Sequence, residues 1–360
     1  MNATDIDSEA SKLECSEPFM ARIHAVARSF LKDKKARGIL QVFLSIVLLI
    51  WLVNRAGLSS IAGVLAGVNW AWYVPAFLLF LLNTILRAYR WYILLNALHD
   101  YVPFRQLVYL YFLGFFFNNF IPSGFGGDVV KIISLRQEHG HGTEALSSVI
   151  MDRATGLLGS AFVALLALTW NSIQPLLARG ATARVSLPPA LLYAIALVSL
   201  GIPLGFALVR WTNPAKSFVT HLPLVRPLAA NSRLQRLAQT VHQYPLLTLL
   251  KALLVSLPFT LNLIATQYCI AQAFSVDVSF YLFPLFVPII AIINLLPISF
   301  NGLGMREGIY QFLFVPAGVP AASAIAMSLA FYFLRAATGL IGGLLYAFKG
   351  IRGATELKTG

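Results

Sequence analysis

Long apolar segments, separated by short polar or basic ones, dominate the chain from residue 38 onward. A membrane-spanning helix takes about 20 predominantly apolar residues, and six segments approach or exceed that length. They are residues 38–53, 70–95, 144–170, 189–209, 245–273 and 321–348. The pattern predicts an all-α polytopic membrane protein with about six spanning helices.

Two further apolar segments, residues 107–121 and 281–297, are short for a span. Each ends in Asn-x-x-Pro, a serine, a glycine cluster and then an acidic residue. Pro and clustered Gly end a helix, and the freed backbone groups are tolerated at membrane depth only where protein or a wet cavity satisfies them. This sequence pattern therefore predicts re-entrant helical hairpins at about 107–135 and 281–315. The alternative is two ordinary short spans with Gly-rich loops. The expected bend residues are Pro122, Gly126, Gly127, Pro297, Gly302 and Gly304.

Composition excludes a soluble globular enzyme, because 58% of the 360 residues are apolar and only 11% are charged. The formal net charge of +13 indicates orientation in a membrane and attraction to anionic inner-leaflet lipids, rather than nucleic-acid binding. Residues 1–37 hold seven Lys/Arg and six Asp/Glu, and we expect them to form a cytosolic tail. The membrane domain is expected over 38–349, and a second cytosolic tail over 350–360.

The distribution of Lys and Arg favours the hairpins. If both short segments are re-entrant, 18 of these residues lie inside and three outside; if both cross fully, the counts are 13 and eight. The positive-inside bias selects the first arrangement. In it the protein lies in a bacterial inner membrane and both termini are in the cytosol. The two hairpins then enter from opposite sides, which is typical of an inverted-repeat transporter whose site lies where they meet.

Ionisable side chains inside the apolar segments are the candidate functional residues. Each costs about 2.5 to 3.5 kcal/mol at the centre of a membrane helix, so such groups normally face the protein interior and line a pathway. The alternatives are mutual neutralisation and, for Arg87 and Arg90, snorkelling to the membrane surface. The set comprises Arg87, Arg90, Asp128, Lys131, Asp152, Arg153, Arg306, Glu307 and Arg335.

Arg306 and Arg335 are the candidates for binding an anion. Glu307 is the one nearby acid, so at least one of the two arginines is expected to be available. The start of a half-helix after Gly304 adds backbone N–H donors, and the guanidinium fork suits a phosphate. The expected ligand is a lipid-borne phosphate.

These same residues resemble the flippase-like membrane domain of the lysylphosphatidylglycerol synthase family. The matching motifs are Arg87-x-x-Arg90-Trp91, Asn119-x-x-Pro122-x-x-x-Gly126-Gly127-Asp128-x-x-Lys131, Asp152-Arg153-x-x-Gly156 and Pro297-x-Ser299-x-x-Gly302-x-Gly304-x-Arg306-Glu307. The resemblance implies movement of a lipid head group across the membrane. It does not imply aminoacyl transfer, which belongs to a soluble C-terminal domain, and only a short segment follows the last apolar helix here. Polar bend residues Asn119, Ser123 and Ser299 complete the expected substrate-binding set.

The favoured function is thus a flippase-like transporter of an anionic phospholipid or a polyisoprenyl-phosphate-type lipid. One rival is a membrane enzyme that transfers a group to or from a lipid head group, with Asp128, Asp152 or Glu307 as general base. Another is an accessory partner of a lipid-synthesis enzyme. No nucleotide-binding motif is present, and His139 with His141 is a weak metal signal, so neither cofactor nor metal is expected.

Overall fold

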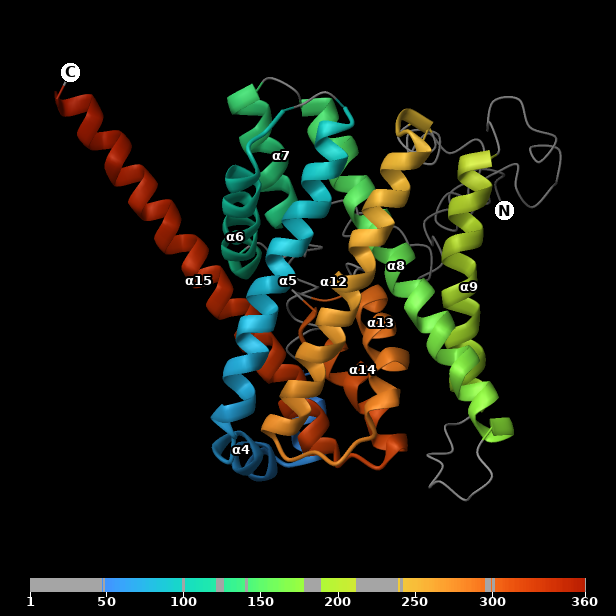
Figure 1. Ribbon diagram of the computed structural model, residues 1–360. Coiled ribbons are helices and arrows are strands. Elements are labelled where there is room, and N and C mark those ends of the chain that lie inside the picture. Colours follow the sequence, from blue (N-terminus) through green and yellow to red (C-terminus); the bar gives the residue numbers. More distant parts are fainter. Residues whose placement is uncertain are drawn as a thin grey trace, which may run out of the picture.

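The computed structural model describes residues 49–98, 101–120, 126–139, 142–177, 189–211, 242–294 and 302–359, together with Val47, Gln239 and Ser299 (Figure 1). These parts of the chain form helices and short connections, without a strand. Residues 1–37, for which the sequence predicts a cytosolic tail, lie outside them.

Four of the six expected spans are helices long and apolar enough to cross a membrane: α5 (Trp70–Asn96), α8 (Gly142–Leu177), α12 (Leu246–Ala273) and α15 (Ala321–Thr359). A fifth, α9 (Pro189–Trp211), contains a shorter apolar stretch over Leu192–Ala207. The all-α polytopic membrane fold predicted from the pattern is therefore confirmed.

The described end of the first expected span, residues 38–53, belongs to a helix that ends in a bend. Its described part, residues 49–56, joins α4 (Leu58–Ala66) at an angle of 81°. The bend lies at Gly57, whose φ of +86° is readily adopted by glycine alone. The bend lies beyond the expected span, between the polar residues Asn54 and Arg55 on one side and Ser59 and Ser60 on the other.

A pair of helices lies at each expected hairpin. The first consists of α6 (Phe104–Phe120) and α7 (Gly126–His139), and the second of α13 (Phe283–Ile293) and α14 (Met305–Phe314), which are flanked by the 3-10 turns η2 (Phe280–Leu282) and η4 (Val315–Ala317). In Figure 1 they occupy opposite halves of the bundle. The α6–α7 pair lies toward the end where α5 finishes and α8 begins, whereas α13 and α14 lie toward the end where α12 finishes and α15 begins.

The packing of the helices follows an inverted repeat of α5–α8 and α12–α15. The central helices α5 and α12 pack against each other over the most extensive interface in the fold. The first hairpin packs its helix α6 on α15 of the other repeat, and the second packs its helix α13 on α8. Each hairpin is thus held by the last long helix of the opposite repeat.

Glycines permit the close contact between α6 and α15. A Cβ atom at Gly342 would lie 2.0 Å from the carbonyl oxygen of Phe112, and one at Gly339 would lie 3.0 Å from that of Phe115. Small residues allow helix backbones to approach closely within a membrane. Beyond this contact α15 runs away from the bundle (Figure 1) and continues as helix through Thr359, including residues for which the sequence predicts a tail.

The two hairpins differ in character. Hairpin two is anchored by aromatic packing, with Phe283 and Phe286 of α13 against Phe314 of α14 at ring-centroid distances of 5.6 and 5.1 Å. These side chains are fully buried. Hairpin one instead turns polar and charged groups toward the centre of the bundle, which is where the candidate site lies.

Candidate functional site

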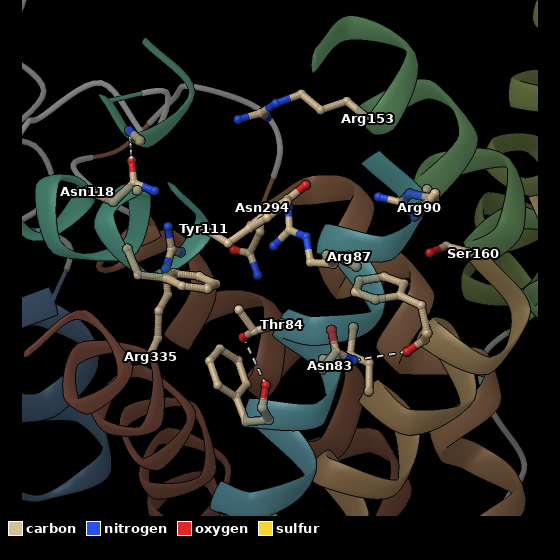
Figure 2. A pocket seen from close by; sticks show the side chains of 18 of the residues that line it. Asn83, Thr84, Arg87, Arg90, Tyr111, Asn118, Arg153, Ser160, Asn294 and Arg335 are labelled. Carbon is tan, nitrogen blue, oxygen red and sulfur yellow. Dashed lines mark hydrogen bonds between the residues drawn. The ribbon is translucent and has the colours of Figure 1, made fainter. Parts of the chain in front are cut away.

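A cavity of about 220 Å³ lies between the ends of the two hairpins. Asn118 from the end of α6 and Asn294 from the end of α13 both line it, and α5, α7, α8, α12 and α15 contribute the remaining walls. Figure 2 shows Arg87, Arg153 and Arg335 extending toward the region between these two asparagines from three different helices. The cavity thus lies where the ends of the two hairpins meet, which is where the sequence predicted a site.

Cations dominate the lining of this cavity. Five basic side chains of the described residues line it, whereas Asp128 is the only acidic residue in the described lining and Asp152 lies directly behind. Among the described residues, these seven groups leave a surplus of three positive charges. The five are Arg87, Arg90, Lys131, Arg153 and Arg335.

Asp152 forms a closed, buried network with Arg90. The Arg90 Nε atom donates to one carboxylate oxygen at 2.7 Å, and the Tyr111 hydroxyl donates to the other at 2.7 Å. A second guanidinium nitrogen of Arg90 donates to the Ser256 hydroxyl at 3.1 Å. Arg90 is only 2% exposed, so it forms a buried ion pair rather than snorkelling. Gly156 makes room for it, since a Cβ there would lie 2.8 Å from the guanidinium.

Asp128 serves two cations at once. It accepts from Lys131 at 3.3 Å and from Arg153, whose Nε atom lies 2.5 Å from the carboxylate. Lys131 is 5% exposed, and its Nζ atom lies 3.4 Å from the centroid of the Tyr111 ring. Such a cation–π contact partly replaces lost hydration. Asp152 thus pairs with Arg90 of α5, and Asp128 pairs both with Lys131 of its own helix and with Arg153 of α8.

Arg87 and Arg335 have no carboxylate partner in the described part of the chain. The Nε atoms of both are buried without a hydrogen-bond acceptor. Arg87 lies over the rings of Tyr111 and Phe259, at 5.4 and 5.8 Å, and Arg335 lies over Phe115 at 6.0 Å. A buried cation without an anion is costly, so these two groups mark where a ligand anion would be stabilised most.

The rest of the lining combines aromatic and aliphatic surface with a few neutral polar groups. The apolar part comprises Phe80, Phe115, Leu157, Phe259, Leu263, Val287, Ile290, Ala291 and Phe331. Of the neutral polar groups, Asn83 already donates to the Phe259 carbonyl at 3.0 Å and Thr84 to the Phe80 carbonyl at 3.1 Å. Asn118 accepts from the Gly127 backbone N–H at 2.7 Å, which ties the two helices of hairpin one together.

Arg306 and Glu307 lie apart from this cavity. Their side chains are at most 2% exposed and pair with each other at 3.2 Å. Ser328 completes the group, because it accepts from Arg306 at 3.0 Å and donates to Glu307 at 2.9 Å. The second carboxylate oxygen of Glu307 accepts from the Gly304 backbone N–H at 2.6 Å. The N-terminus of α14 is therefore capped by its own acid rather than turned to a ligand.

The bend residues occupy positions that suit glycine. Gly302 and Gly304 have φ angles of +81° and +77°, where a side chain would be strained. Gly127 has an ordinary φ, but a Cβ there would lie 2.4 Å from the Gly114 carbonyl oxygen. Gly126 begins α7. Pro122, Ser123 and Pro297 lie outside the described residues.

Two of the expected polar bend residues do not reach the cavity. Asn119 lies against Gly339 of α15, where a Cβ at that glycine would come within 2.5 Å of its amide nitrogen. Ser299 is buried with its hydroxyl unpartnered and is absent from the lining.

Sequence reasoning missed several lining residues. Asn83, Thr84, Tyr111, Asn118, Ser160, Gln267 and Asn294 all line the cavity. A signal for part of this set was available on α5, because Asn83, Arg87 and Arg90 recur at helical spacing on one face of an otherwise apolar helix. Tyr111 and Gln267 had no such signal, since single polar atoms in apolar helices are common.

No group of three or more His, Cys, Asp or Glu side chains suited to a metal ion occurs among the described residues. His139 and His141, the weak metal signal in the sequence, are not placed: His141 is outside these residues, and nothing is described of the His139 side chain.

Comparison with known proteins identifies the family. Residues 38–343 match the model of the lysylphosphatidylglycerol synthase TM region. The chain is also similar to a UPF0104 membrane protein of Methanothermobacter thermautotrophicus, with 26% identity over 348 residues, which cover 86% of this chain and 93% of that relative. Because the family model extends from the first apolar segment into α15, this chain is a multi-pass membrane protein of the lysylphosphatidylglycerol synthase transmembrane-region family.

Proposed function

We propose that this protein is a carrier that moves an anionic lipid across the cytoplasmic membrane. The observation that carries the proposal is the charge surplus inside a cavity at the meeting point of two opposed hairpins. Arg87 and Arg335 have no carboxylate partner there, and a guanidinium binds phosphate through several charge-assisted hydrogen bonds. The adjoining apolar surface, which includes Phe80, Phe115 and Phe331, suits the first carbons of a lipid chain.

Arg87 takes the role that the sequence favoured for Arg306. Arg306 is fully engaged with Glu307 and Ser328, so recruiting it would break a buried ion pair. Arg335 keeps its expected role. In the proposal Lys131 and Arg153 are auxiliary cations, held by Asp128 until a ligand anion competes for them.

A carrier is favoured over a membrane enzyme by the state of the carboxylates. Asp128, Asp152 and Glu307 each accept from two or more donors. A general base needs a lone pair directed at the substrate, whereas these oxygens are directed at cations, hydroxyls or backbone. They are better suited to positioning the cationic side chains.

Reconstitution into vesicles tests the proposal. Phosphatidylglycerol, phosphatidic acid and phosphatidylcholine, each with a fluorophore on the acyl chain, would be followed by quenching from outside, and extracted lipids would be chromatographed. We expect the two anionic lipids to cross without change and phosphatidylcholine to cross far more slowly. Losing one charge-assisted bond costs about 1.5 to 3 kcal/mol, so Arg87→Ala and Arg335→Ala should slow movement roughly 10-fold or more.

Arg105→Ala is the matched control, because Arg105 lies exposed at the start of α6, outside the cavity lining. It should move lipid at the unaltered rate. The proposal would be refuted if all three lipids moved at equal rates and if Arg87→Ala and Arg335→Ala left those rates unchanged. A new lipid species in the extract would instead indicate the enzyme.

A further inference from the structure

We infer that the lipid recognised here ends in a phosphate monoester, a terminal phosphate that carries two negative charges, rather than in a phosphodiester or an aminoacylated head group. The inference rests on the proposed function and deepens it. It is drawn from the balance of charge in the cavity, the space available, and the geometry of the two cations without a carboxylate partner, Arg87 and Arg335.

Charge balance separates the classes of head group. The cavity and the acid behind it hold five cations against two carboxylates. A doubly charged phosphate would leave one positive charge uncompensated, and a singly charged phosphodiester would leave two. A zwitterionic head group would leave all three positive charges uncompensated. A cationic, aminoacylated head group would add a further positive charge. Uncompensated charge in a poorly hydrated site is unfavourable, so affinity should follow this order.

The environment of the acids points the same way. A lipid amine needs an accessible carboxylate, but Asp128 is engaged by Lys131 and Arg153. Asp152 has one oxygen bound by Arg90 and the other by Tyr111. In the described lining, no carboxylate is left to receive an ammonium group, whereas Arg87 and Arg335 retain donors.

Space also favours a bare terminal phosphate. The cavity of about 220 Å³ is smaller than the roughly 300–1,000 Å³ typical of pockets for drug-sized ligands. A monoester places only the phosphate and the start of its chain in it. A diester must place a second alcohol there as well, beside cations that already lie against the rings of Tyr111, Phe259 and Phe115.

A matched pair of ligands gives the sharpest test. Dodecyl phosphate and methyl dodecyl phosphate share chain and phosphorus, but the methyl ester has one charge fewer and one terminal oxygen fewer. Binding of each to the purified protein in a neutral detergent would be measured by calorimetry at pH 8. We expect the monoester to bind at least 10-fold more tightly, and dodecyltrimethylammonium not to bind. Inorganic phosphate tests what the alkyl chain of the ligand contributes to binding. It should bind at least 10-fold more weakly than dodecyl phosphate.

The advantage should depend on the ligand's own second ionisation. A phosphate monoester has a second pKa of about 6, so the ratio between the two ligands should shrink below pH 6 while methyl dodecyl phosphate binding changes less. Arg87→Ala and Arg335→Ala should each reduce the ratio, and Arg87→Lys and Arg335→Lys should restore it in part. Arg105→Ala should leave it unchanged. Unfolding temperatures of all variants would show that each remains folded.

The outcomes are distinguishable from those of the transport assay. Equal or tighter binding of methyl dodecyl phosphate would overturn the monoester inference, yet leave an anionic-lipid carrier standing if vesicles still move phosphatidylglycerol. Equal binding of inorganic phosphate would overturn the lipid part of the inference. Failure of both dodecyl ligands to bind the folded protein would overturn the inference, and failure of both anionic lipids to move would overturn the proposed function.

Discussion

The ammonium group of Lys131 lies 3.4 Å from the centroid of the Tyr111 ring. The same ring carries a hydroxyl that donates to Asp152 at 2.7 Å. Tyr111 therefore connects the two ion-pair clusters of the cavity, one around Asp128 on α7 and the other around Asp152 on α8. Together with the direct ion pair between Asp128 and Arg153, this side chain couples hairpin one to the long helix that follows it.

Replacing Tyr111 by Phe removes the hydrogen bond to Asp152 and keeps the aromatic ring. The ring contact with Lys131 would remain, while the buried Asp152 would lose one of its donors. Leaving a buried charged acceptor unsatisfied costs about 1.5 to 3 kcal/mol, so the unfolding temperature should fall and the monoester affinity should change little. Differential scanning fluorimetry in detergent measures the first and calorimetry the second. An unaltered unfolding temperature would contradict the assigned hydrogen bond.

Asp128→Asn should have opposite effects on stability and on ligand binding. Removing this acid breaks its pairing with Lys131 and Arg153; a fully buried ion pair costs about 3 to 5 kcal/mol to break, and the cost here should be smaller because Asp128 is 15% exposed. It also raises the cationic surplus, so dodecyl phosphate should bind more tightly and produce a larger thermal shift than in the unaltered protein. Lipid movement should slow, because release becomes harder. Weaker binding of dodecyl phosphate would argue that Asp128 contacts the ligand through a shared proton or water instead.

Arg306 and Glu307 should behave as scaffolding. Both are at most 2% exposed, paired, and absent from the cavity lining. Arg306→Ala and Glu307→Gln should each lower the free energy of unfolding, by about 3 to 5 kcal/mol, and leave the affinity of the remaining folded protein unchanged. Thermal unfolding and calorimetry on the same preparation separate the two quantities. Loss of affinity with full stability in Arg306→Ala would restore this arginine to the binding site.

The contact between α6 and α15 should fail if Gly342 gains a methyl group. A Cβ there would lie 2.0 Å from the Phe112 carbonyl oxygen, and overpacking of this kind costs about 1 to 3 kcal/mol. Gly201→Ala, in α9, is the matched control, since no atom lies within 4 Å of its added Cβ and alanine favours helix by up to about 1 kcal/mol. Gly342→Ala should lower the unfolding temperature and Gly201→Ala should not.

Cysteine labelling tests the orientation in the membrane. In a chain with Cys15 and Cys269 replaced, Gln137→Cys at the exposed end of α7 should react only from the cytosol. Ser279→Cys, exposed next to hairpin two, should react only from outside. Labelling both from the same side would contradict opposed re-entrant hairpins. Ile325→Cys, at a fully buried position outside the cavity lining, provides an unreactive reference.

The sequence by itself determined the helical membrane fold, both hairpins and the inventory of charges. Apolar length sets the number of long helices, and Pro with clustered Gly after a short apolar segment marks where a helix must end. Charges within apolar segments had to face the interior, and Arg87, Lys131 and Arg335 do line the cavity. These features depend on local chemistry and on the membrane as solvent, and both can be inferred from the order of residues.

Only the tertiary structure decided which charges pair and which remain without a carboxylate. Asp152 pairs with Arg90 rather than with its neighbour Arg153, and Glu307 retains Arg306 with help from Ser328. The choice depends on how far each helix is rotated about its axis and how closely its neighbours approach, which packing at positions such as Gly156 and Gly342 sets. Sequence separation carries no information on that rotation, and for this reason the unpartnered cation beside Arg335 is Arg87 and not Arg306.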